Sequence, residues 1–446
     1  MQDKLRKAGE KVLTAAKKAG VEAEAFLLFN RELTVEVLEG QVDTLTQADE
    51  IGIGLRVINK GRLGFAYTSN LSEPAIKSLV EDAVNISSFT AIDEYNCLPA
   101  VVSDYPDLDI YDPQIPATDL DIKLELARLV EQSALKSDSR VKIIEKAGYE
   151  EGEYTSLIMN TNGLNAFSRG NYCGLYAFVV GEENSDAQTG FSVMTKRSIK
   201  ELDPGAVGKE AADNAVRNLN PRTIGSTEMP CVIEPYVMTR FLGILARMVN
   251  AGAVQKGKSL LAGRQEQVVG SPVLSITDDA TYEGGMASFP FDGEGIPAQK
   301  TQILSAGILK NFLYDTYTAK KDGTRSTGNG QRASFRSLPS VGPSNFILEP
   351  GRDEPAKLVN AIKRGIYITD VMGVHTANPV SGDFSLGAQG IMIENGHLTY
   401  PLRGLTIAGN MIGFLEAIEA VGNDLRFYGG KASPTVLLRR LSIGGE

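Results

Sequence analysis

The sequence predicts an α+β fold, with an N-terminal α+β domain built on an antiparallel sheet and helices and a β-rich C-terminal domain. The chain has 446 residues, more than one typical domain holds, so two or three domains are expected. Its 46 glycines follow no fixed period, which excludes collagen and indicates many turns between short strands. Helical apolar spacing occurs mainly in the first half, where it alternates with strand patterns.

Residues 1–220 alternate between helical and strand patterns. Apolar residues three and four positions apart predict helices, which are bounded by suitable capping residues such as Gly20 and Asp203. Short apolar or alternating runs predict antiparallel meanders, and Asn162–Gly163 is a hairpin signal. The expected elements are, in order, a helix over 5–19, a meander over 25–68 with turns at 39–41 and 60–62, a helix over 74–88, a helix opened by a capping box at Thr118 and Asp121, a meander over 141–197, and a helix from Asp203–Pro204 to about Leu219.

A linker and a domain boundary interrupt this pattern. Residues 93–117 are rich in Pro and Asp and lack helical periodicity, so we expect a long crossing linker there. We expect the domain boundary at Asn220–Pro221, which gives domains over 1–220 and 221–446. The second domain opens with the apolar segment CVIEP and a helix through Phe241, and then consists of glycine-punctuated strands such as SAGILKNFLYD and IENGHLTYP.

Composition limits the classes of function. The formal net charge of −10 disfavours binding along nucleic acid or an anionic membrane. The 3 cysteines are far apart and form no CxxC pair, so we expect buried thiols in a reducing compartment. The N-terminus has no signal-peptide core and no run of eighteen apolar residues occurs, so we expect a cytoplasmic protein that spans no membrane.

Two glycine motifs resemble nucleotide-binding loops. GAVQKGKS (252–259) matches the letters of a phosphate-binding loop, but the residues before it have helical periodicity where a strand is required. We therefore interpret it as a basic loop after a helix. Gly52 and Gly54 do not complete a dinucleotide fingerprint, and a strand that passes close to another backbone explains them better.

Hydrolytic chemistry finds little support in the residues themselves. The chain has only 2 histidines, His375 in a polar loop and His397 at a turn, whereas a hydrolytic zinc site usually needs three protein ligands. A triad of His375 with Asp383 and Ser381 or Ser385 remains open, although residues so close in sequence rarely form one. Carboxylate pairs such as Asp278–Asp279 and Asp292–Glu294 are more often turn-forming than catalytic.

The polar segments of the second half resemble those of the TldD/PmbA family, whose members have long been labelled modulators of DNA gyrase. The segments that carry the resemblance are FPFDGEGIPAQKTQIL (289–304), STGNGQRASF (326–335), NPVSGDFSLGAQGIMIENG (378–396), LTIAGN (405–410) and VGNDLRF (421–427). The resemblance extends over nearly the whole chain and implies an α+β N-terminal region and a β-rich C-terminal region.

The resemblance also implies what this chain lacks. In that family the TldD-type subunit carries a zinc motif, HExxxH, on a helix, together with a cysteine near the C-terminus, and hydrolyses small unfolded peptides. The corresponding helix here is FLGILARMVNAG (241–252), which has neither histidine nor the glutamate, and the last twenty residues contain no cysteine. The chain therefore resembles the PmbA (TldE) branch. We expect no cofactor in this chain, zinc in a TldD-type partner subunit, and a homodimer when the chain is alone.

The function expected from this resemblance is that of a non-catalytic subunit of a TldD/PmbA-type zinc metallopeptidase complex acting on small unfolded peptides. Two alternatives stay open: the chain is itself a metallopeptidase with a non-standard metal site, or it regulates a DNA-handling enzyme. The residues expected to line a groove for a peptide or the partner are Asn329, Arg332, His375, Asn378, Asp383 and Ser385.

Overall fold

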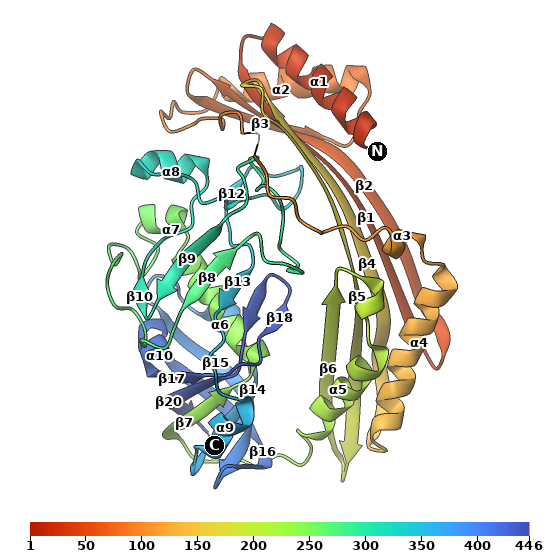
Figure 1. Ribbon diagram of the computed structural model, residues 1–446, viewed down its shortest axis with the longest axis vertical. Helices are drawn as coiled ribbons and strands as arrows, with labels where there is room; N and C mark the ends of the chain where they lie inside the picture. The colour runs from red at the N-terminus through yellow and green to blue at the C-terminus, as the bar shows by residue number, and fades with distance from the viewer. Residues whose placement is uncertain (103, 446) are drawn as a thin grey trace.

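The computed structural model describes residues 1–102 and 104–445 and confirms the α+β fold. The first half of the chain builds one long, curved antiparallel sheet, and the second half builds a more compact unit beside it (Figure 1). Across the first sheet the strands run in the order β3 (Arg62–Thr68), β2 (Gln41–Asn59), β1 (Glu22–Leu38), β4 (Val141–Asn160), β5 (Asn165–Glu183) and β6 (Asp186–Lys196). The helical segments of this half are α1 (Gln2–Lys18), α2 (Glu73–Ser87), α3 (Gln114–Ala117), α4 (Leu120–Ser137), η1 (Ile199–Glu201) and α5 (Pro204–Val216).

One face of this sheet is covered by helices at both of its ends. Side chains alternate between the two faces of a strand, and the odd-numbered residues of β1 face the helices. At one end, Ala25 and Leu27 pack against α1 and α2. At the other end, Val35 and Val37 pack against α4 and α5. The even-numbered residues of β1 therefore point to the opposite, inner face, toward the second half of the chain.

The second half packs two sheets around a buried helix. Helix α6 lies between them, and its apolar side chains belong to the same core as residues of both sheets. One sheet has the order β10-β9-β8-β13-β19-β18, and the other has the order β16-β15-β14-β7-β20-β17. The elements are β7 (Thr227–Ile233), α6 (Pro235–Met248), α7 (Ala251–Gln255), β8 (Ile276–Asp279), β9 (Lys300–Ser305), β10 (Ile308–Leu309), α8 (Thr316–Asp322), β11 (Gly330–Gln331), β12 (Ser340–Val341), β13 (Phe346–Leu348), α9 (Pro355–Asn360), β14 (Arg364–Met372), η2 (Val374–Thr376), β15 (Asp383–Glu394), β16 (His397–Asn410), α10 (Met411–Ala417), β17 (Ile418–Val421), β18 (Arg426–Tyr428), β19 (Lys431–Ser433) and β20 (Val436–Gly444).

Most of the predicted elements are present, but the linker predicted over 93–117 ends in the short helix α3, and the predicted capping box is wrong. Both meanders, the helices and the hairpin turn at Asn162–Gly163 occur where the sequence indicated them. The capping box before α4 does not form: the N-cap is Asp119, without a side-chain cap, and the Thr118 hydroxyl donates instead to the carbonyl of Gln114 at 2.8 Å. The short helix α3 places that carbonyl within reach, so a local hydrogen bond replaces the cap. Among the described residues, no helix has both the length and the apolar character that a membrane crossing requires.

The two glycines of IGIGL allow the second half of the chain to approach the inner face of the sheet. A β-carbon built at Gly52 would lie 2.3 Å from the ring of Phe335, and one at Gly54 would lie 2.2 Å from the Phe335 carbonyl oxygen. No side chain fits at either distance. The prediction that this strand passes close to another backbone is confirmed, and Phe335 is completely buried against it.

A buried network of charged side chains joins the two halves beside Phe335. Arg56 on β2 donates to Glu24 on β1 at 2.8 Å and to Glu294 in the loop after β8 at 2.9 Å. Arg332 donates to the other carboxylate oxygen of Glu24. Glu24 and Glu294 are fully buried and Arg56 is nearly so. Because an unpaired charge in such a place is very costly, the network is stable only when both halves are docked.

Asp292 holds the loop that carries Glu294 in place. Its carboxylate accepts hydrogen bonds from the backbone N–H groups of Glu294 at 2.9 Å, Ile296 at 3.0 Å and Gly330 at 2.7 Å. Burial and the neighbouring Glu294 raise the pKa of Asp292 to about 8. The three backbone donors thus fix the loop that places Glu294 against Arg56.

We predict that Arg332→Met lowers the free energy of unfolding by roughly 3–5 kcal/mol, because the substitution leaves Glu24 buried with one partner removed. The matched control is Arg31→Met on the same strand as Glu24. It removes the ion pair between Arg31 and Asp49, whose side chains are 46% and 43% exposed. Such surface pairs contribute about 0.2–1 kcal/mol to the free energy of unfolding. Urea unfolding followed by circular dichroism measures both. Equal losses for the two variants would show that the buried network does not hold the halves together.

Candidate functional site

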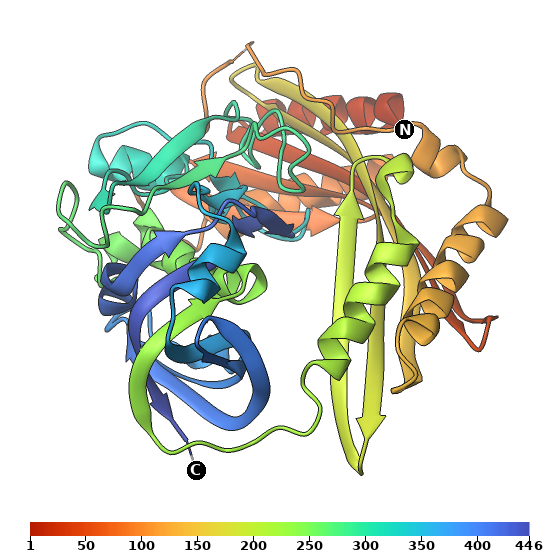
Figure 2. The same cartoon turned by 60° about the horizontal axis from the view of Figure 1, so that its bottom comes forward.

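The second half covers only part of the inner face of the first sheet, and the uncovered part forms a cleft. Near α1 and α2 the inner face is filled, since Phe26 and Leu28 pack against Phe291 and Phe335. Toward α4 and α5 the face is open to a hollow of about 1030 Å³, which we call the wide cleft. Figures 1 and 2 show β5 and β6 facing β18 across this region. The wide cleft is lined by Glu36, Glu145, Lys146, Glu150, Tyr176, Phe178, Phe191, Val193, Thr195, Tyr236, Met286, Phe427, Tyr428 and Gly429.

Aromatic side chains from both halves line the wide cleft as a continuous series. Tyr176 and Phe178 on β5 are 6.4 Å apart between ring centroids, and Phe178 stacks on Phe191 of β6 at 5.9 Å. Phe191 meets Tyr236, at the start of α6, at 4.9 Å, and Tyr236 meets Tyr428 of β18 at 5.2 Å. Phe178 keeps 41% of its surface exposed. The cleft thus presents aromatic surface of the kind that binds apolar side chains or extended backbone.

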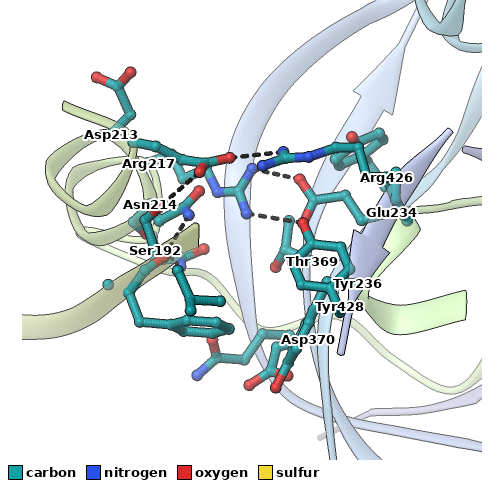
Figure 3. A pocket seen from close by; sticks show the side chains of 18 of the residues that line it. Ser192, Asp213, Asn214, Arg217, Glu234, Tyr236, Thr369, Asp370, Arg426 and Tyr428 are labelled. Atoms are coloured by element: carbon teal, nitrogen blue, oxygen red, sulfur yellow. Dashed lines mark hydrogen bonds and ion pairs between the residues drawn. The ribbon is translucent and has the colours of Figure 1, made fainter. Parts of the chain in front are cut away.

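A second hollow of about 460 Å³, the polar recess, adjoins the wide cleft and shares Phe191, Val193, Tyr236 and Tyr428 with it. Its lining residues come from β6 and α5 on one side and from the start of α6, β14 and β18 on the other (Figure 3). It is therefore bounded by both halves of the chain, and its shape depends on how they are docked.

Two ion pairs cross the polar recess. Arg217, at the end of α5, donates to both carboxylate oxygens of Glu234, the N-cap residue of α6, at 2.5 and 3.0 Å. Arg426 on β18 pairs with Glu210 on α5 at 2.6 Å, and Ser192 donates to the same carboxylate at 2.6 Å (Figure 3). Burial by itself would raise the pKa of Glu210, but the bonds from Arg426 and Ser192 outweigh it and the pKa is lowered. Both pairs fix the relative position of the two walls.

The polar recess also contains hydrogen-bonding groups without a protein partner. Within the described part of the chain, the Nε of Arg217 and the hydroxyl of Thr369 are buried and make no hydrogen bond. Burial raises the pKa of Asp370, the next residue along β14. Buried polar groups rarely stay unpaired, so these groups are suited to contact a polar ligand or solvent.

The donor set of this chain does not fit a catalytic zinc ion. Over residues 1–102 and 104–445, no three His, Cys, Asp or Glu side chains come together in a way that could hold a metal. His375 follows one end of β14, and His397 faces the other end through its hairpin with β15. A strand of this length separates them by roughly 25 Å, so they cannot share an ion. Asp383, the first carboxylate after His375 in the sequence, is hydrogen-bonded by Asn410 at 2.9 Å.

The six predicted groove residues divide into two sets, and neither lines the wide cleft or the polar recess. Asn329 is buried and donates to Asp278 at 2.7 Å, and Arg332 belongs to the buried charge network and borders a separate hollow of about 320 Å³. The other four residues are exposed on η2 and around the start of β15, and comprise His375, Asn378, Asp383 and Ser385. Their role in a peptide or partner groove stays a prediction.

Sequence reasoning missed the residues that line the cleft. Tyr176, Phe178 and Phe191 occupy alternate strand positions, as any half-buried strand would show. The one usable signal was that both faces of β5 carry apolar residues, whereas in the structure helices cover only one of them. Arg217 and Glu234 flank the predicted domain boundary and carry no local motif.

Comparisons with known proteins match one family along nearly the whole chain. Three models of the PmbA/TldD family match, described as PmbA/TldA metallopeptidase domain 1 (residues 23–87), central domain (113–219) and C-terminal domain (226–445). The chain is 29% identical over 450 residues to a metalloprotease PmbA homolog of Haemophilus influenzae, covering 100% of this chain and 97% of that protein.

Solved structures match equally broadly. A Thermotoga maritima protein described as a candidate modulator of DNA gyrase is 29% identical with a TM-score of 0.91, covering 98% of this chain and 100% of that one. TldE from Thermococcus kodakarensis has the same fold, with a TM-score of 0.91 at 22% identity, covering 98% of this chain and 100% of that one.

We predict that the ion pair between Arg426 and Glu210 stabilises the folded protein in a pH-dependent way. Because the folded-state pKa of Glu210 is lowered, its contribution is fully present above the unfolded-state value of about 4.5 and is lost as pH falls through the folded-state pKa. A double-mutant cycle of Glu210→Gln and Arg426→Met, measured by urea unfolding at pH 7 and in steps down to pH 3, gives the coupling energy. A coupling that does not decline below pH 4.5 would contradict this interpretation.

Proposed function

Because the chain belongs to the TldD/PmbA metallopeptidase family, we propose that it is the non-catalytic subunit of a peptidase complex. Its partner is a subunit that carries the HExxxH zinc motif, and the substrates are small unfolded peptides. In this proposal the zinc ion resides in the partner, and this chain contributes the wide cleft and the polar recess to peptide binding.

The observation that carries the proposal is the surface of α6. This helix corresponds to the one on which the resemblance places the zinc motif, and the side chains that it exposes are Tyr236, Arg240 and Arg247. None of these is a carboxylate, thiol or imidazole, the groups that bind zinc in proteins. A family member without zinc donors at this position is best explained as a subunit that supports catalysis elsewhere in a complex.

The wide cleft is suited to an extended peptide. Its floor is the inner face of a sheet that ends at β6, whose outer edge carries backbone groups for pairing with an added strand. The Phe191 carbonyl of β6 already accepts a hydrogen bond from Asn214 at 2.9 Å, so an added strand would pair with the other backbone groups of β6. Backbone pairing requires no particular peptide sequence, and the aromatic series supplies apolar contacts beside it. The volume of about 1030 Å³ suffices for a short peptide rather than a folded protein.

We predict that the purified chain contains far less than one zinc ion per subunit and shows no chelator-sensitive peptidase activity. Mixed with an HExxxH-bearing homologue, it should form a stable complex whose peptidase activity exceeds that of either chain alone. Size-exclusion chromatography, metal analysis of the separated subunits and turnover of a short unstructured peptide measure these properties. Stoichiometric zinc in this chain would favour an independent peptidase, and a fully active homologue that forms no complex at micromolar concentrations would overturn the proposal.

We predict that Phe178→Ala weakens peptide turnover by the complex several-fold through a higher KM, because the substitution removes exposed aromatic surface from the wide cleft. The matched control is Phe89→Ala, which removes a ring that is 83% exposed and lies outside the cleft. Both variants should form the complex with unchanged elution volume. Equal turnover by the two variants would show that the wide cleft does not hold the peptide.

A further inference from the structure

The exposed stripe of α6 carries a cluster of positive charges. Every residue of α6 is buried except Tyr236, Arg240, Gly243 and Arg247. These positions are three or four residues apart, so they form one line along the helix surface. The line runs from the aromatic wall of the wide cleft at Tyr236 to Arg247, over roughly 16 Å.

A third cation joins this stripe from the neighbouring strand. Lys431 on β19 lies over Gly243: a β-carbon at Gly243 would come within 3.2 Å of the Lys431 Cε, so glycine leaves the space that the lysine side chain fills. Lys431 is half-buried. Burial and the positive charges of Arg240 and Arg247 lower the pKa of Lys431. The three charges are therefore close enough to repel one another.

No carboxylate of the described residues pairs directly with the cluster, although Asp370 in the polar recess is near enough to Arg240 for that positive charge to oppose the rise that burial causes in the pKa of Asp370. Over residues 1–102 and 104–445, no Asp or Glu forms an ion pair with Arg240, Arg247 or Lys431. Arg240 lies over the ring of Tyr236, 5.1 Å from its centroid, and Arg247 makes a long contact of 3.4 Å to the Gly243 carbonyl. Solvated surface cations need no partner, but the half-buried ammonium of Lys431 is held beside two guanidiniums where an anion would relieve the repulsion.

We propose that Arg240, Arg247 and Lys431 bind the carboxylate of the peptide that the wide cleft holds, an inference that rests on the proposed function. Guanidinium groups match a carboxylate with paired hydrogen bonds, and the lysine adds a point charge. The cluster is continuous with the cleft, since Tyr236 begins the stripe and Gly429, two residues before Lys431, also lines the wide cleft. Four or five extended residues span the length of the stripe.

This arrangement selects peptides by size rather than by sequence. Every short peptide ends in a free carboxylate, whereas the interior of a folded chain offers none. A cationic cluster at the end of a cleft that holds the backbone would therefore favour small peptides with free C-termini. An acidic side chain presents the same group, so the experiment must separate these two sources.

The test uses N-acetylated hexapeptides of Ala, Ser and Val, titrated into the full-length chain by isothermal titration calorimetry. One peptide ends in a free carboxylate, the second in an amide, and the third in an amide with Glu as its last residue. The free acid should bind the unaltered chain roughly tenfold more tightly than the plain amide. In the double variant Arg247→Gln with Lys431→Met this difference should disappear. Lys17→Gln on α1 removes one exposed charge far from the cluster in sequence and should keep it.

The outcomes distinguish a C-terminal carboxylate from a side-chain carboxylate, and the carboxylate site from peptide binding by the cleft alone. Tight binding of the amide that carries Glu would show that a side-chain carboxylate also serves, which supports the site. Equal binding of the free acid and the plain amide would overturn this inference and leave peptide capture by the cleft intact. Failure of every peptide to bind, to this chain and to its complex with an HExxxH-bearing homologue, would overturn both. A double variant that alters only the elution volume would assign the cluster to a contact between subunits instead.

The folding of the double variant has its own measurement. Because Lys431→Met replaces a half-buried, repelled ammonium with an apolar side chain of similar length, the variant should melt at a higher temperature than the unaltered chain in the absence of peptide. A lower melting temperature would show that Lys431 has a stabilising partner and would contradict the repulsion on which the site depends.

Discussion

The burial of Arg56 and Arg332 around Glu24 and Glu294 determines how the two halves of this protein fit together. Charged groups removed from water are stable only when each one has its partners, and here the partners come from β1, β2 and two loops of the second half. A sliding or tilting of one half would leave a buried charge unpaired. The network therefore fixes the relative position of the two halves, together with the close contact between Gly52 and Phe335.

The position of the buried charge network accounts for the location of the wide cleft. The second half is held at the α1 and α2 end of the sheet, where its loops cover Phe26 and Leu28. The strands continue well beyond this contact, so the inner face near β5 and β6 stays uncovered although its other face is sealed by α4 and α5. The ion pairs across the polar recess then set the width of the gap, with Arg217 bound to Glu234 and Arg426 bound to Glu210. A rigid frame with one open face is what peptide capture requires.

The chemistry of α6 agrees with a role in recognition. The helix on which the family resemblance places the zinc motif of TldD-type subunits exposes cations and an aromatic ring here, groups that attract anions and apolar side chains. Gly243 on this helix has a packing role, because it makes room for Lys431. The chain as a whole has a net charge of −10, so this local positive charge is unusual for its surface. It lies next to the wide cleft.

The sequence by itself determined the local structure of this protein. Helices, meanders and the turn at Asn162–Gly163 follow from the spacing of residues that are near one another in the chain. The close backbone approach at Gly54 follows from the absence of a side chain there. The capping box at Thr118 does not form, because Asp119 is the N-cap and the Thr118 hydroxyl donates to the Gln114 carbonyl of α3 instead.

Tertiary structure alone decided which polar residues are buried and where the cleft lies. Asn329 and Arg332 are in segments that look like exposed functional loops, yet their partners Asp278 and Glu24 lie 51 and 308 positions away. The aromatic series joins Phe178 to Tyr428 through residues of four different elements. Such sites form where segments that are distant in the sequence come into contact. No periodicity or motif within one segment predicts these contacts, because the interactions between the segments exist only after the chain has folded.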